Sequence, residues 1–398
     1  MARMKSQTKW HCMVVLAYYP LGETRVQREA EALVAHGYEV DVLCLRGRDE
    51  SPEAVHQGVS IHRLPLRIKK SSLFKQFLNY LQFFILAAIA VTRLHWKHAY
   101  SSIQVHNLPD FLVFCTLLPK LNGVPVILDL HDLMPEFYVG RFGVSKGGWL
   151  SALVRWQERQ ACKFADHVIT VSEHWRQALI QRGVPANKCS VVMNVADERI
   201  FTPGPARDRP RMDQSFRMIY HGSVVYRYGL DLAIQAVNVV KDEIPGIHLT
   251  ILGDGDAIPD LIKMTETLGL QDHVAIYDEL RPAEELPEII RAADLGVVPY
   301  RNDVFTDGLL PTKLMEYAAM GLPSIASRTT AMERYFSDTM AEFFLPGDAD
   351  GLARCIRLLY TSPQRMTELK AGCAVFNERY NWKKISAEYA ALVAGLHS

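Results

Sequence analysis

FTDGLLPTKLMEYAAMGLPSIAS, residues 305–327, is the stretch around which we interpret the rest of the chain. It predicts a loop, a short helix and then a buried strand. Pro311 suits the first turn of a helix, because the N–H group that proline lacks has no helical partner there. Leu314 and Tyr317 fall on one face at helical spacing, and Gly321 is placed to end the helix in a left-handed turn.

The start of this predicted helix is a candidate phosphate-binding site. A helix N-terminus offers backbone N–H groups and a positive dipole end, and Lys313 stands beside it. Glu316 lies one turn further on, in a helix whose other residues are largely apolar. An acid in that setting needs a partner, so we expect Glu316 to bind one.

The same alternation of strands and helices runs through the whole chain. Strand, loop, helix and strand follow one another over residues 13–45, which predicts a parallel α/β sheet. The pattern restarts at Arg217, after a Pro- and Arg-rich segment that has no apolar periodicity. A chain of 398 residues is also long enough for two domains. We therefore predict one α/β domain over 1–203, a linker over 204–214 and a second α/β domain over 215–380.

Polar side chains follow the predicted strands of the first domain. His106 and His131 with Asp132 each come directly after a strand, as do Ser172 and Asn194. Ligands of open parallel sheets bind outside the carboxyl ends of the strands, so we expect these residues to line one crevice.

The formal net charge of zero hides an asymmetry between the two halves. Up to Ile200 the chain has 24 Lys and Arg against 17 Asp and Glu, and beyond it 20 against 27. No acidic residue occurs between Glu53 and Asp110. A basic N-terminal half favours an anionic partner on that side.

An apolar segment, Leu73–Val91, lies within this basic stretch. Only Phe83–Val91 is uniformly apolar, which is too short for the roughly 20 residues that span a bilayer. One interpretation is an interfacial helix with basic flanks that rests on an anionic membrane surface. The other is a core helix of the first domain with a solvated basic rim, and the sequence leaves both open.

The seven cysteines show no metal or redox spacing. Four of them, Cys12, Cys44, Cys115 and Cys162, sit in apolar runs and are expected to be buried free thiols. Free thiols suggest a reducing compartment, so we expect a cytoplasmic protein that can also lie on the inner face of a membrane. The Gly-Asp-Gly-Asp run at Gly253 is better interpreted as a tight turn than as a dinucleotide fingerprint, because Ile258 stands where a third glycine is needed.

In the order and spacing of its motifs, the chain resembles the retaining glycosyltransferases of family four. The resemblance covers nearly the whole chain and rests on these segments: Arg25-Val-Gln-Arg-Glu-Ala-Glu-Ala-Leu, Asp129-Leu-His-Asp, Val171-Ser172, Asn194-Val-Ala-Asp197, His221-Gly222-Ser, Tyr228-Gly-Leu-Asp-Leu-Ala, Leu252-Gly-Asp-Gly, Ala293-Asp-Leu-Gly and 305–327. It implies the GT-B fold, in which two Rossmann-like, doubly wound domains face each other across a cleft. The first domain would bind the acceptor and be completed by a C-terminal helix over 382–398, and the second would bind a nucleotide sugar.

The resemblance also implies donor-binding roles. Glu316 matches the acid that holds the donor ribose hydroxyls, and the alternative is a surface acid paired with Lys313. Gly22 would let the backbone approach the phosphate, unless it serves only as a turn. Contacts to the diphosphate and sugar are implied for these further residues: Gly222, Gly253, Leu309, Leu310, Pro311 and Thr312.

The sequence departs from the family pattern at three donor-side positions. Gly308 stands where the first acid of a glutamate pair is expected, and neither Asp303 nor Asp307 is in register to replace it. Ser223 and Tyr228 stand where the family has Arg and Lys. We therefore assign neutralisation of the diphosphate to two other cations, Arg227 and Lys313, with a solvated loop residue as the alternative for Arg227.

On the acceptor side, His131 matches the histidine that faces the reacting sugar carbon. The alternative is a buried histidine hydrogen-bonded to Asp129 or Asp132. His106 is a weaker candidate for the same side, together with Asp132.

The implied reaction moves a sugar from a nucleoside-diphosphate sugar to an acceptor hydroxyl with retention of anomeric configuration. A saccharide or lipid-linked acceptor in cell-surface polysaccharide or glycolipid assembly fits this reading, with no cofactor, no metal and no nucleic acid. Two alternatives stay open: a nucleotide-sugar 2-epimerase on the same fold, and a non-catalytic nucleotide-sugar-binding protein.

Overall fold

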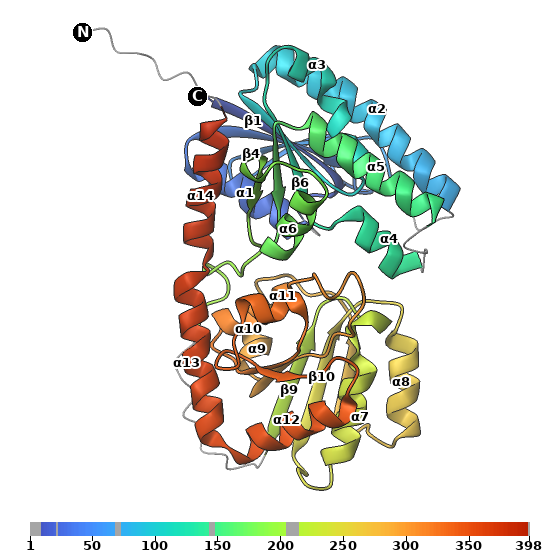
Figure 1. Cartoon of the computed structure of the whole chain (residues 1–398), viewed down its shortest axis with the longest axis vertical. Coiled ribbons are helices and arrows are strands. Elements are labelled where there is room, and N and C mark those ends of the chain that lie inside the picture. Colours follow the sequence, from blue (N-terminus) through green and yellow to red (C-terminus); the bar gives the residue numbers. More distant parts are fainter. Residues whose placement is uncertain (1–8, 21–22, 68–72, 143–147, 204–214, 397–398) are drawn as a thin grey trace, which may run out of the picture. The chain divides into compact units, whose positions relative to one another are not determined.

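The computed structural model describes residues 9–20, 23–67, 73–142, 148–203 and 215–396. The chain divides into two compact units (Figure 1). The first comprises Met1–Asn194 and Lys384–Ser398, and the second comprises Val195–Lys383. The predicted linker, 204–214, and the candidate residue Gly22 lie outside the described residues.

The described strands of the first unit form one eight-stranded sheet in the order β3-β4-β2-β1-β5-β6-β7-β8, parallel except for the antiparallel pair β3 and β4. Its strands are β1 (Lys9–Tyr18), β2 (Tyr38–Leu45), β3 (Glu53–His56), β4 (Val59–Leu64), β5 (Ser102–His106), β6 (Val126–Leu130), β7 (His167–Thr170) and β8 (Cys189–Val191). Its helices are α1 (Thr24–Ala35), α2 (Leu73–His98), α3 (Leu117–Leu121), α4 (Met134–Phe142), α5 (Trp149–Phe164) and α6 (Glu173–Gln181), with 3-10 turns η1 (Asp110–Thr116) and η2 (Ala186–Lys188). Helix α14 (Trp382–Gly395) returns from the second unit to the first.

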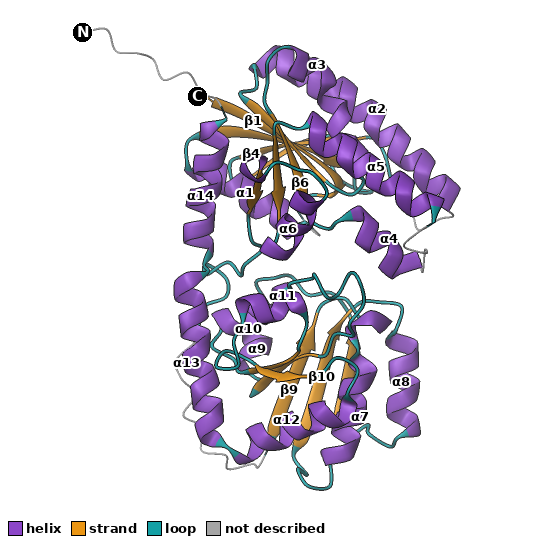
Figure 2. Cartoon of the chain, in the orientation of Figure 1, coloured by secondary structure: helices purple, strands orange, loops and turns teal. Residues whose placement is uncertain are grey.

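The second unit has a six-stranded parallel sheet in the order β11-β10-β9-β12-β13-β14. Its strands are β9 (Phe216–His221), β10 (Ile247–Gly253), β11 (Val274–Asp278), β12 (Leu295–Val298), β13 (Ser324–Ser327) and β14 (Glu342–Phe344). Its helices are α7 (Leu230–Val240), α8 (Ile258–Thr267), α9 (Leu286–Arg291), α10 (Thr312–Ala319), α11 (Thr330–Tyr335), α12 (Ala349–Thr361) and α13 (Pro363–Arg379), with a 3-10 turn η3 (Tyr226–Tyr228). Figure 2 shows helices on both faces of each sheet, so both units are doubly wound.

Each sheet reverses its winding at one point. In the first unit the chain moves outward from β1 to β2, and then restarts on the other side of β1 at β5. In the second unit it moves from β9 to β10 and β11, and then restarts beside β9 at β12. Ligands of such sheets bind outside the strand ends at this switch point, which directs attention to the ends of β5 and β6 and to the loops after β9 and β12.

The helix that we predicted from 305–327 is α10. Leu314 and Tyr317 are buried, and Gly321 ends the helix with a φ of 67°. Ser172 caps α6 as expected, because its hydroxyl accepts a hydrogen bond from the backbone N–H of Trp175 at 3.2 Å. The seven cysteines are buried free thiols.

Some expected elements differ. The single helix predicted over Phe111–Leu121 is instead the 3-10 turn η1 followed by the one-turn helix α3. We expected a parallel first sheet, but β3 pairs with β4 in the antiparallel direction, since only a short turn joins them.

Candidate functional site

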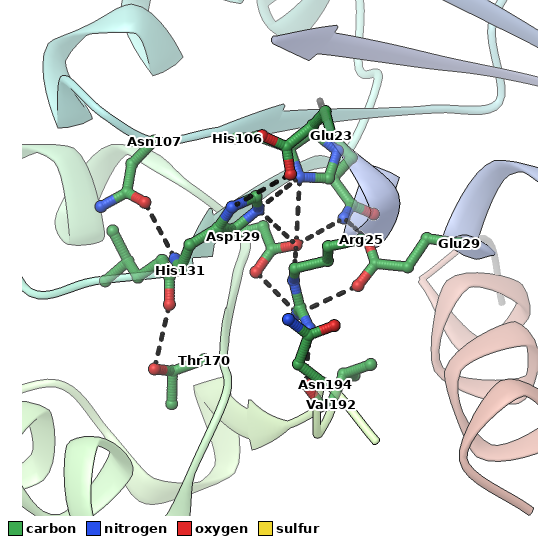
Figure 3. A network of polar contacts seen from close by, with 12 residues as sticks. Glu23, Arg25, Glu29, His106, Asn107, Asp129, His131, Thr170, Val192 and Asn194 are labelled. Carbon is green, nitrogen blue, oxygen red and sulfur yellow. Dashed lines mark hydrogen bonds and ion pairs between the residues drawn. The ribbon is translucent and has the colours of Figure 1, made fainter. Parts of the chain in front are cut away.

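The switch point of the first unit holds a network of buried charges (Figure 3). Arg25 of α1 donates hydrogen bonds to both carboxylate oxygens of Asp129 in β6, at 2.9 and 3.0 Å. Arg25 also lies 3.0 Å from the carboxylate of Glu29, one turn along α1. All three side chains are almost completely buried.

Neutral groups complete this network. Gln104 of β5 donates to Glu29 at 2.7 Å and to Asp129 at 3.1 Å, and accepts a hydrogen bond from the hydroxyl of Tyr389 in α14. Burial raises the pKa of Glu29 to about 8 despite the nearby Arg25. Burial would also raise the pKa of Asp129, but Arg25 and His131 hold it well below its usual range.

The two candidate histidines of the first unit meet at Asp129. Nδ1 of His106 lies 3.1 Å from the Asp129 carboxylate and 3.0 Å from Nε2 of His131, which in turn lies 3.5 Å from the same carboxylate. Burial lowers the pKa of His106 to about 4. Burial also acts to lower the pKa of His131, but the Asp129 carboxylate outweighs it, so that the net shift is upward.

His131 is the more accessible of the two histidines. It is half-buried, and its Nδ1 lies 3.7 Å from the carboxylate of Glu23. Its backbone N–H donates to the side-chain oxygen of Asn107 at 2.8 Å, and the amide nitrogen of Asn107 donates to the carbonyl of Asp132 at 2.6 Å. Asn107 therefore fixes the loop that presents His131 and Asp132.

His106, Asp129 and His131 are close enough to hold a metal ion, because one ligand atom from each lies within 4.8 Å of the others. However, both oxygens of Asp129 accept hydrogen bonds from Arg25, and the raised pKa of His131 favours its protonated form. A cation would have to enter beside a guanidinium group and displace this proton. The arrangement fits a hydrogen-bonded ion network better than a metal centre.

In the second unit, two glycines bring the ends of β9 and β10 together. A Cβ atom on Gly253 would lie 1.8 Å from the carbonyl oxygen of Gly222, so only glycine fits there. Gly222 has a φ of 103° and donates its N–H to the carbonyl of Leu252 at 2.9 Å. In the structure, Gly253 allows the ends of β9 and β10 to approach each other closely. The contact to the donor substrate that the resemblance implies for Gly253 stays a prediction.

Lys313 lies at the same point. A Cβ atom on Gly222 would be 3.6 Å from Nζ of Lys313, so the ammonium group approaches the loop after β9. The lysine is buried against aromatic rings: Nζ lies 4.8 Å from the ring centre of Tyr220, 5.3 Å from that of Tyr228 and 5.2 Å from that of Tyr300. Nζ also donates a hydrogen bond to the Tyr300 hydroxyl at 2.7 Å.

These neutral surroundings change the acidity of Lys313. Burial lowers its pKa to about 8, and the negative charge of Glu316 offsets only part of this effect. The rings of Tyr228 and Tyr300 stack with their centres 4.2 Å apart, which holds the pocket in shape. The ammonium group is thus desolvated and held by ring faces and a hydroxyl group.

Glu316 binds a partner that the sequence did not suggest. Its Oε2 lies 2.6 Å from Nε2 of His221, and Nδ1 of His221 lies 3.1 Å from the hydroxyl of Tyr317. The alternative for Glu316 was a surface acid paired with Lys313. The structure does not show this pair, because Lys313 donates its hydrogen bond to Tyr300 and Glu316 bonds to His221. The side chain of Glu316 keeps 17% of its surface exposed.

The acids near Gly308 have backbone partners. One oxygen of Asp303 accepts hydrogen bonds from the N–H groups of Phe305 and Thr306, each at 2.8 Å. One oxygen of Asp307 accepts from the N–H of Thr330 at 3.0 Å, at the start of α11. These bonds shape the loop before α10, and Gly308 itself is buried in it.

The remaining donor-side candidates lie on either side of this loop. Arg227, in η3, is half-buried with its guanidinium carbon 5.3 Å from the ring centre of Phe305. Leu310 and Pro311 are buried just before α10, whereas Leu309 and Thr312 are half-buried. The loop after β9 and the start of α10 thus carry most of the described donor-side candidates.

Sequence reasoning missed the ion network around Asp129 and the tyrosine pocket. One signal for the network was available: Arg25 and Glu29 are four residues apart on the face of α1 that also carries Val26, Ala30 and Leu33, which are buried. An opposite-charge pair on an apolar helix face predicts a buried ion pair. The tyrosine pocket gave no comparable signal, because its three rings come from separate loops and strands.

Two protein-family comparisons agree with this division of the chain. Residues 22–194 match the family described as "Glycosyl transferase 4-like domain", and residues 215–362 match the family described as "Glycosyl transferases group 1". Together they cover most of both described units.

Similar full-length proteins are named glycosyltransferases. A glycosyl transferase assigned to colanic acid biosynthesis in Escherichia coli, WcaI, is 25% identical over 295 residues, which is 70% of this chain and 67% of that protein. A GDP-mannose-dependent alpha-(1-6)-phosphatidylinositol monomannoside mannosyltransferase of Mycolicibacterium smegmatis is 27% identical over 261 residues, 62% of this chain and 67% of that protein. Among solved structures, Alr3699/HepE of Anabaena, crystallised with UDP, has a TM-score of 0.72 at 16% identity and covers 98% of this chain and 100% of that one.

Proposed function

The chain belongs to the GT4-type glycosyltransferases with the GT-B fold, and from this premise we propose that it moves a sugar from a nucleoside-diphosphate sugar to an acceptor hydroxyl with retention of anomeric configuration. The observation that carries the proposal is Lys313, a desolvated ammonium group beside Gly222 at the start of α10. A diphosphate is the ligand that such a group attracts most strongly, because it combines two negative charges with several acceptor oxygens.

Lys313 and the first turn of α10 would bind the diphosphate in this proposal. The N–H groups of a first helical turn have no intrahelical partner and favour an anion. Charge builds on the diphosphate as the bond to the sugar breaks, so a cation fixed in place stabilises the transition state more than the ground state. Lys313 takes the place of the two cations that the family has at Ser223 and Tyr228, and Arg227 would supply the second positive charge.

Glu316 would hold the ribose of the donor. Its bond to His221 fixes the carboxylate in one orientation, and the exposed part of the side chain can accept hydroxyl hydrogen bonds. Hydrogen bonds to a charged group contribute about 1.5–3 kcal/mol each. The structure of HepE with UDP supports a nucleotide as a ligand of this fold. That the donor of this chain is a nucleotide sugar is our proposal.

His131 would act on the acceptor side, with His106 and Asp132 beside it. The Asp129 carboxylate favours the protonated form of His131, which suits an imidazole that donates a hydrogen bond to a substrate hydroxyl or to developing negative charge. We name no covalent nucleophile. The leaving diphosphate would accept the proton of the attacking hydroxyl, which needs no metal or cofactor.

We further propose a cytoplasmic reaction in cell-surface polysaccharide or glycolipid assembly, with a saccharide or lipid-linked acceptor. The names of two relatives support this: one is assigned to colanic acid biosynthesis and the other acts on a phosphatidylinositol mannoside. The seven unpaired thiols fit a reducing compartment.

A donor panel tests the proposal. Thermal unfolding is followed with UDP-, GDP-, ADP- and dTDP-sugars, and a true donor at about 100 times its dissociation constant should add about 2.7 kcal/mol of stability. Glu316→Ala should abolish the shift, whereas Glu284→Ala, an exposed acid outside the candidate site, should keep it. If no nucleotide sugar stabilises the wild-type protein, the donor assignment is wrong.

Product analysis then tests the stereochemistry. Proton NMR of the glycoside formed from the best donor should show the anomeric configuration of that donor. An inverted product contradicts the retaining mechanism. Tight donor binding without transfer to any acceptor would favour a non-catalytic binding protein, and a sugar recovered as its 2-epimer would favour an epimerase.

A further inference from the structure

Helix α2 carries two apolar faces, of which one is buried in the first unit. Phe83, Ala87 and Val91 are fully buried and belong to the core of the domain. The opposite face carries the exposed side chains Phe77, Leu78, Leu81, Ile85, Ile89 and Trp96. The interpretation as a core helix is confirmed, and the exposed apolar stripe leaves the interpretation as an interfacial helix a prediction.

Two neighbouring helices extend this stripe into a surface. Both α2 and α5 pack against η1, with Phe84 6.0 Å from Phe111 and Phe114 5.0 Å from Phe164 between ring centres. Figure 1 shows α2, α3 and α5 on the same side of the first unit. The exposed side chains of the other two helices are Leu117, Leu118 and Leu121 in α3, and Trp149, Leu153 and Trp156 in α5. We call these exposed residues of α2, α3 and α5 the three-helix surface.

The three-helix surface holds more exposed apolar side chains than the rest of the described chain. Twelve of the 22 large apolar residues that are exposed in the described part belong to it. They include the three exposed tryptophans, with Trp96 exposed to 72%, Trp149 to 79% and Trp156 to 59%. Tryptophan is the side chain that prefers the boundary between lipid and water, because its ring is apolar and its N–H can bond to head groups.

The charges on these helices have one sign. Six exposed cations lie on α2 and α5: Lys75, Arg93, Lys97, Arg155, Arg159 and Lys163. Neither α2 nor α3 contains an acidic residue, and the acid of α5, Glu158, is buried in an ion pair with Arg182. An anionic surface is the charge complement of this arrangement.

We propose that the three-helix surface docks the first unit on an anionic lipid bilayer, with α2 and α5 lying in the plane of the interface. Basic side chains would reach lipid phosphates while the apolar stripes enter the acyl boundary. By length and composition, α2 could cross a membrane over Lys75–His98. If α2 crossed a membrane, Phe83, Ala87 and Val91 would have to leave the core of the first unit. If α2 lies in the plane of the interface, only its exposed face contacts the lipid.

The charge pattern argues against a second copy of the chain as the occupant. In a two-fold symmetric pair the same patch meets itself, so the cations of one copy would face those of the other. Like charges placed opposite each other oppose association. A bilayer also accepts exposed apolar side chains from several helices without a complementary pocket.

Vesicle binding by the full chain tests this proposal without donor or acceptor, so its outcome is independent of the sugar-transfer assays. The probe is co-sedimentation with phosphatidylcholine vesicles, with and without phosphatidylglycerol. The protein should bind the anionic vesicles at least about tenfold more strongly than the neutral ones, and added salt should weaken the binding. Tryptophan fluorescence should shift to shorter wavelength on binding, because three of the six tryptophans lie on the proposed interface.

Paired variants locate the binding face. Ile85→Glu with Ile89→Glu on α2, and Trp149→Ser with Trp156→Ser on α5, should each reduce binding at least about tenfold. The matched control is Ile262→Glu on α8, an exposed isoleucine (42%) of the second unit, which should bind like the wild type. Arg155→Gln with Arg159→Gln should reduce binding to anionic vesicles, whereas Lys263→Gln should not.

Each variant is accepted only if its thermal unfolding matches the wild type, which these exposed positions allow. The proposal is overturned if the wild type ignores anionic vesicles at low salt, or if the α2 and α5 pairs bind as well as Ile262→Glu. It is also overturned if the wild type is a dimer by light scattering that Ile85→Glu converts to a monomer while vesicles stay unbound, because a second copy then covers the surface.

Discussion

The first unit gathers a buried ion pair and its hydrogen-bonded neighbours around Asp129 at the ends of β5 and β6, whereas the second unit holds a buried lysine against neutral tyrosine rings. Arg25 is paired with Asp129 and also lies beside Glu29, each within 3.0 Å, and burial raises the pKa of Glu29 to about 8. Lys313 has a hydroxyl group as its hydrogen-bond partner and a pKa lowered to about 8 by burial. The same switch-point topology therefore holds a cation paired with a carboxylate in one unit and a cation bonded to a neutral hydroxyl group in the other.

This difference suggests different roles. Breaking a buried ion pair is costly because the remaining charge is left buried and uncompensated, so the pair of Arg25 and Asp129 is expected to hold the strand ends and the histidines in place. A desolvated cation without a bonded anion gains most when an anion arrives. The second unit is therefore expected to respond to ligand, and the first to support the geometry around His131.

The largest effect is expected from Asp129→Ala. This change leaves the guanidinium group of Arg25 buried with Glu29 as its remaining acid, and breaking such a pair costs about 3–5 kcal/mol of stability. Chemical denaturation of the two proteins measures the loss. Arg281→Ala, which removes exposed pairs with Glu279 and Glu285, is the control and should leave the midpoint unchanged. A small loss for Asp129→Ala would mean that the network is not what holds the strand ends.

The next effect is expected from Lys313→Met, which keeps the length of the side chain but removes its charge. Donor turnover, measured as kcat/KM, should fall about 10²–10³-fold, the range seen when one preorganised donor to developing charge is removed. Thermal stability should stay equal or rise, because the buried ammonium group costs desolvation in the free protein. Lys263→Met on α8 is the control. A marked loss of stability with unchanged turnover would assign Lys313 to structure instead of to the donor.

The pH dependence of donor binding gives a smaller but more specific effect. Burial lowers the pKa of Lys313 to about 8, so its side chain should be charged below that pH and lose its charge above it. A bound diphosphate favours the charged form, and donor affinity should therefore fall as pH rises above 8, by up to about tenfold per pH unit. Isothermal titration across this range measures the slope. The Lys313→Met protein should show a flat profile, and an equal slope in that variant would attribute the titration to another group.

The smallest effect is expected from Tyr300→Phe. It removes the hydroxyl that accepts the hydrogen bond of Lys313 at 2.7 Å and keeps the ring that stacks on Tyr228. A single hydrogen bond contributes about 0.5–1.5 kcal/mol, so donor affinity should change by roughly threefold. Tyr226→Phe, which changes an exposed tyrosine of η3, should leave affinity unchanged. A change as large as that of Lys313→Met would mean that the hydroxyl itself binds the donor.

Local patterns were enough to predict two successive α/β sheets and most of their strands and helices, and the resemblance of the motifs to a known family then implied the GT-B fold. The strand ends at His106, His131 and Ser172 follow from apolar runs that stop at a polar residue, and Gly321 follows from the need for a left-handed turn. The α2 segment was ambiguous because its two faces are both apolar, and periodicity alone cannot tell which one the core will use.

The partners of the site residues could not be predicted in the same way. Arg25 and Asp129 are 104 positions apart, and Glu316 and His221 are 95 apart. The absence of the family's cations at Ser223 and Tyr228 was visible in the sequence, but the contact between the Tyr228 ring and the ammonium group of Lys313 was not.

The sequence by itself determined the two α/β sheets and the start of α10 next to Pro311, because short-range spacing decides which residues can form a helix or strand and where it ends. Only the tertiary structure decided which buried charges pair with an opposite charge and which, like Lys313, bond to a neutral group. The pairing depends on the fold, which brings side chains that are distant in the sequence within 3 Å of each other. It also depends on the removal of water, because low polarity strengthens the attraction between opposite charges and makes a buried cation without a charged partner attract an anion more strongly.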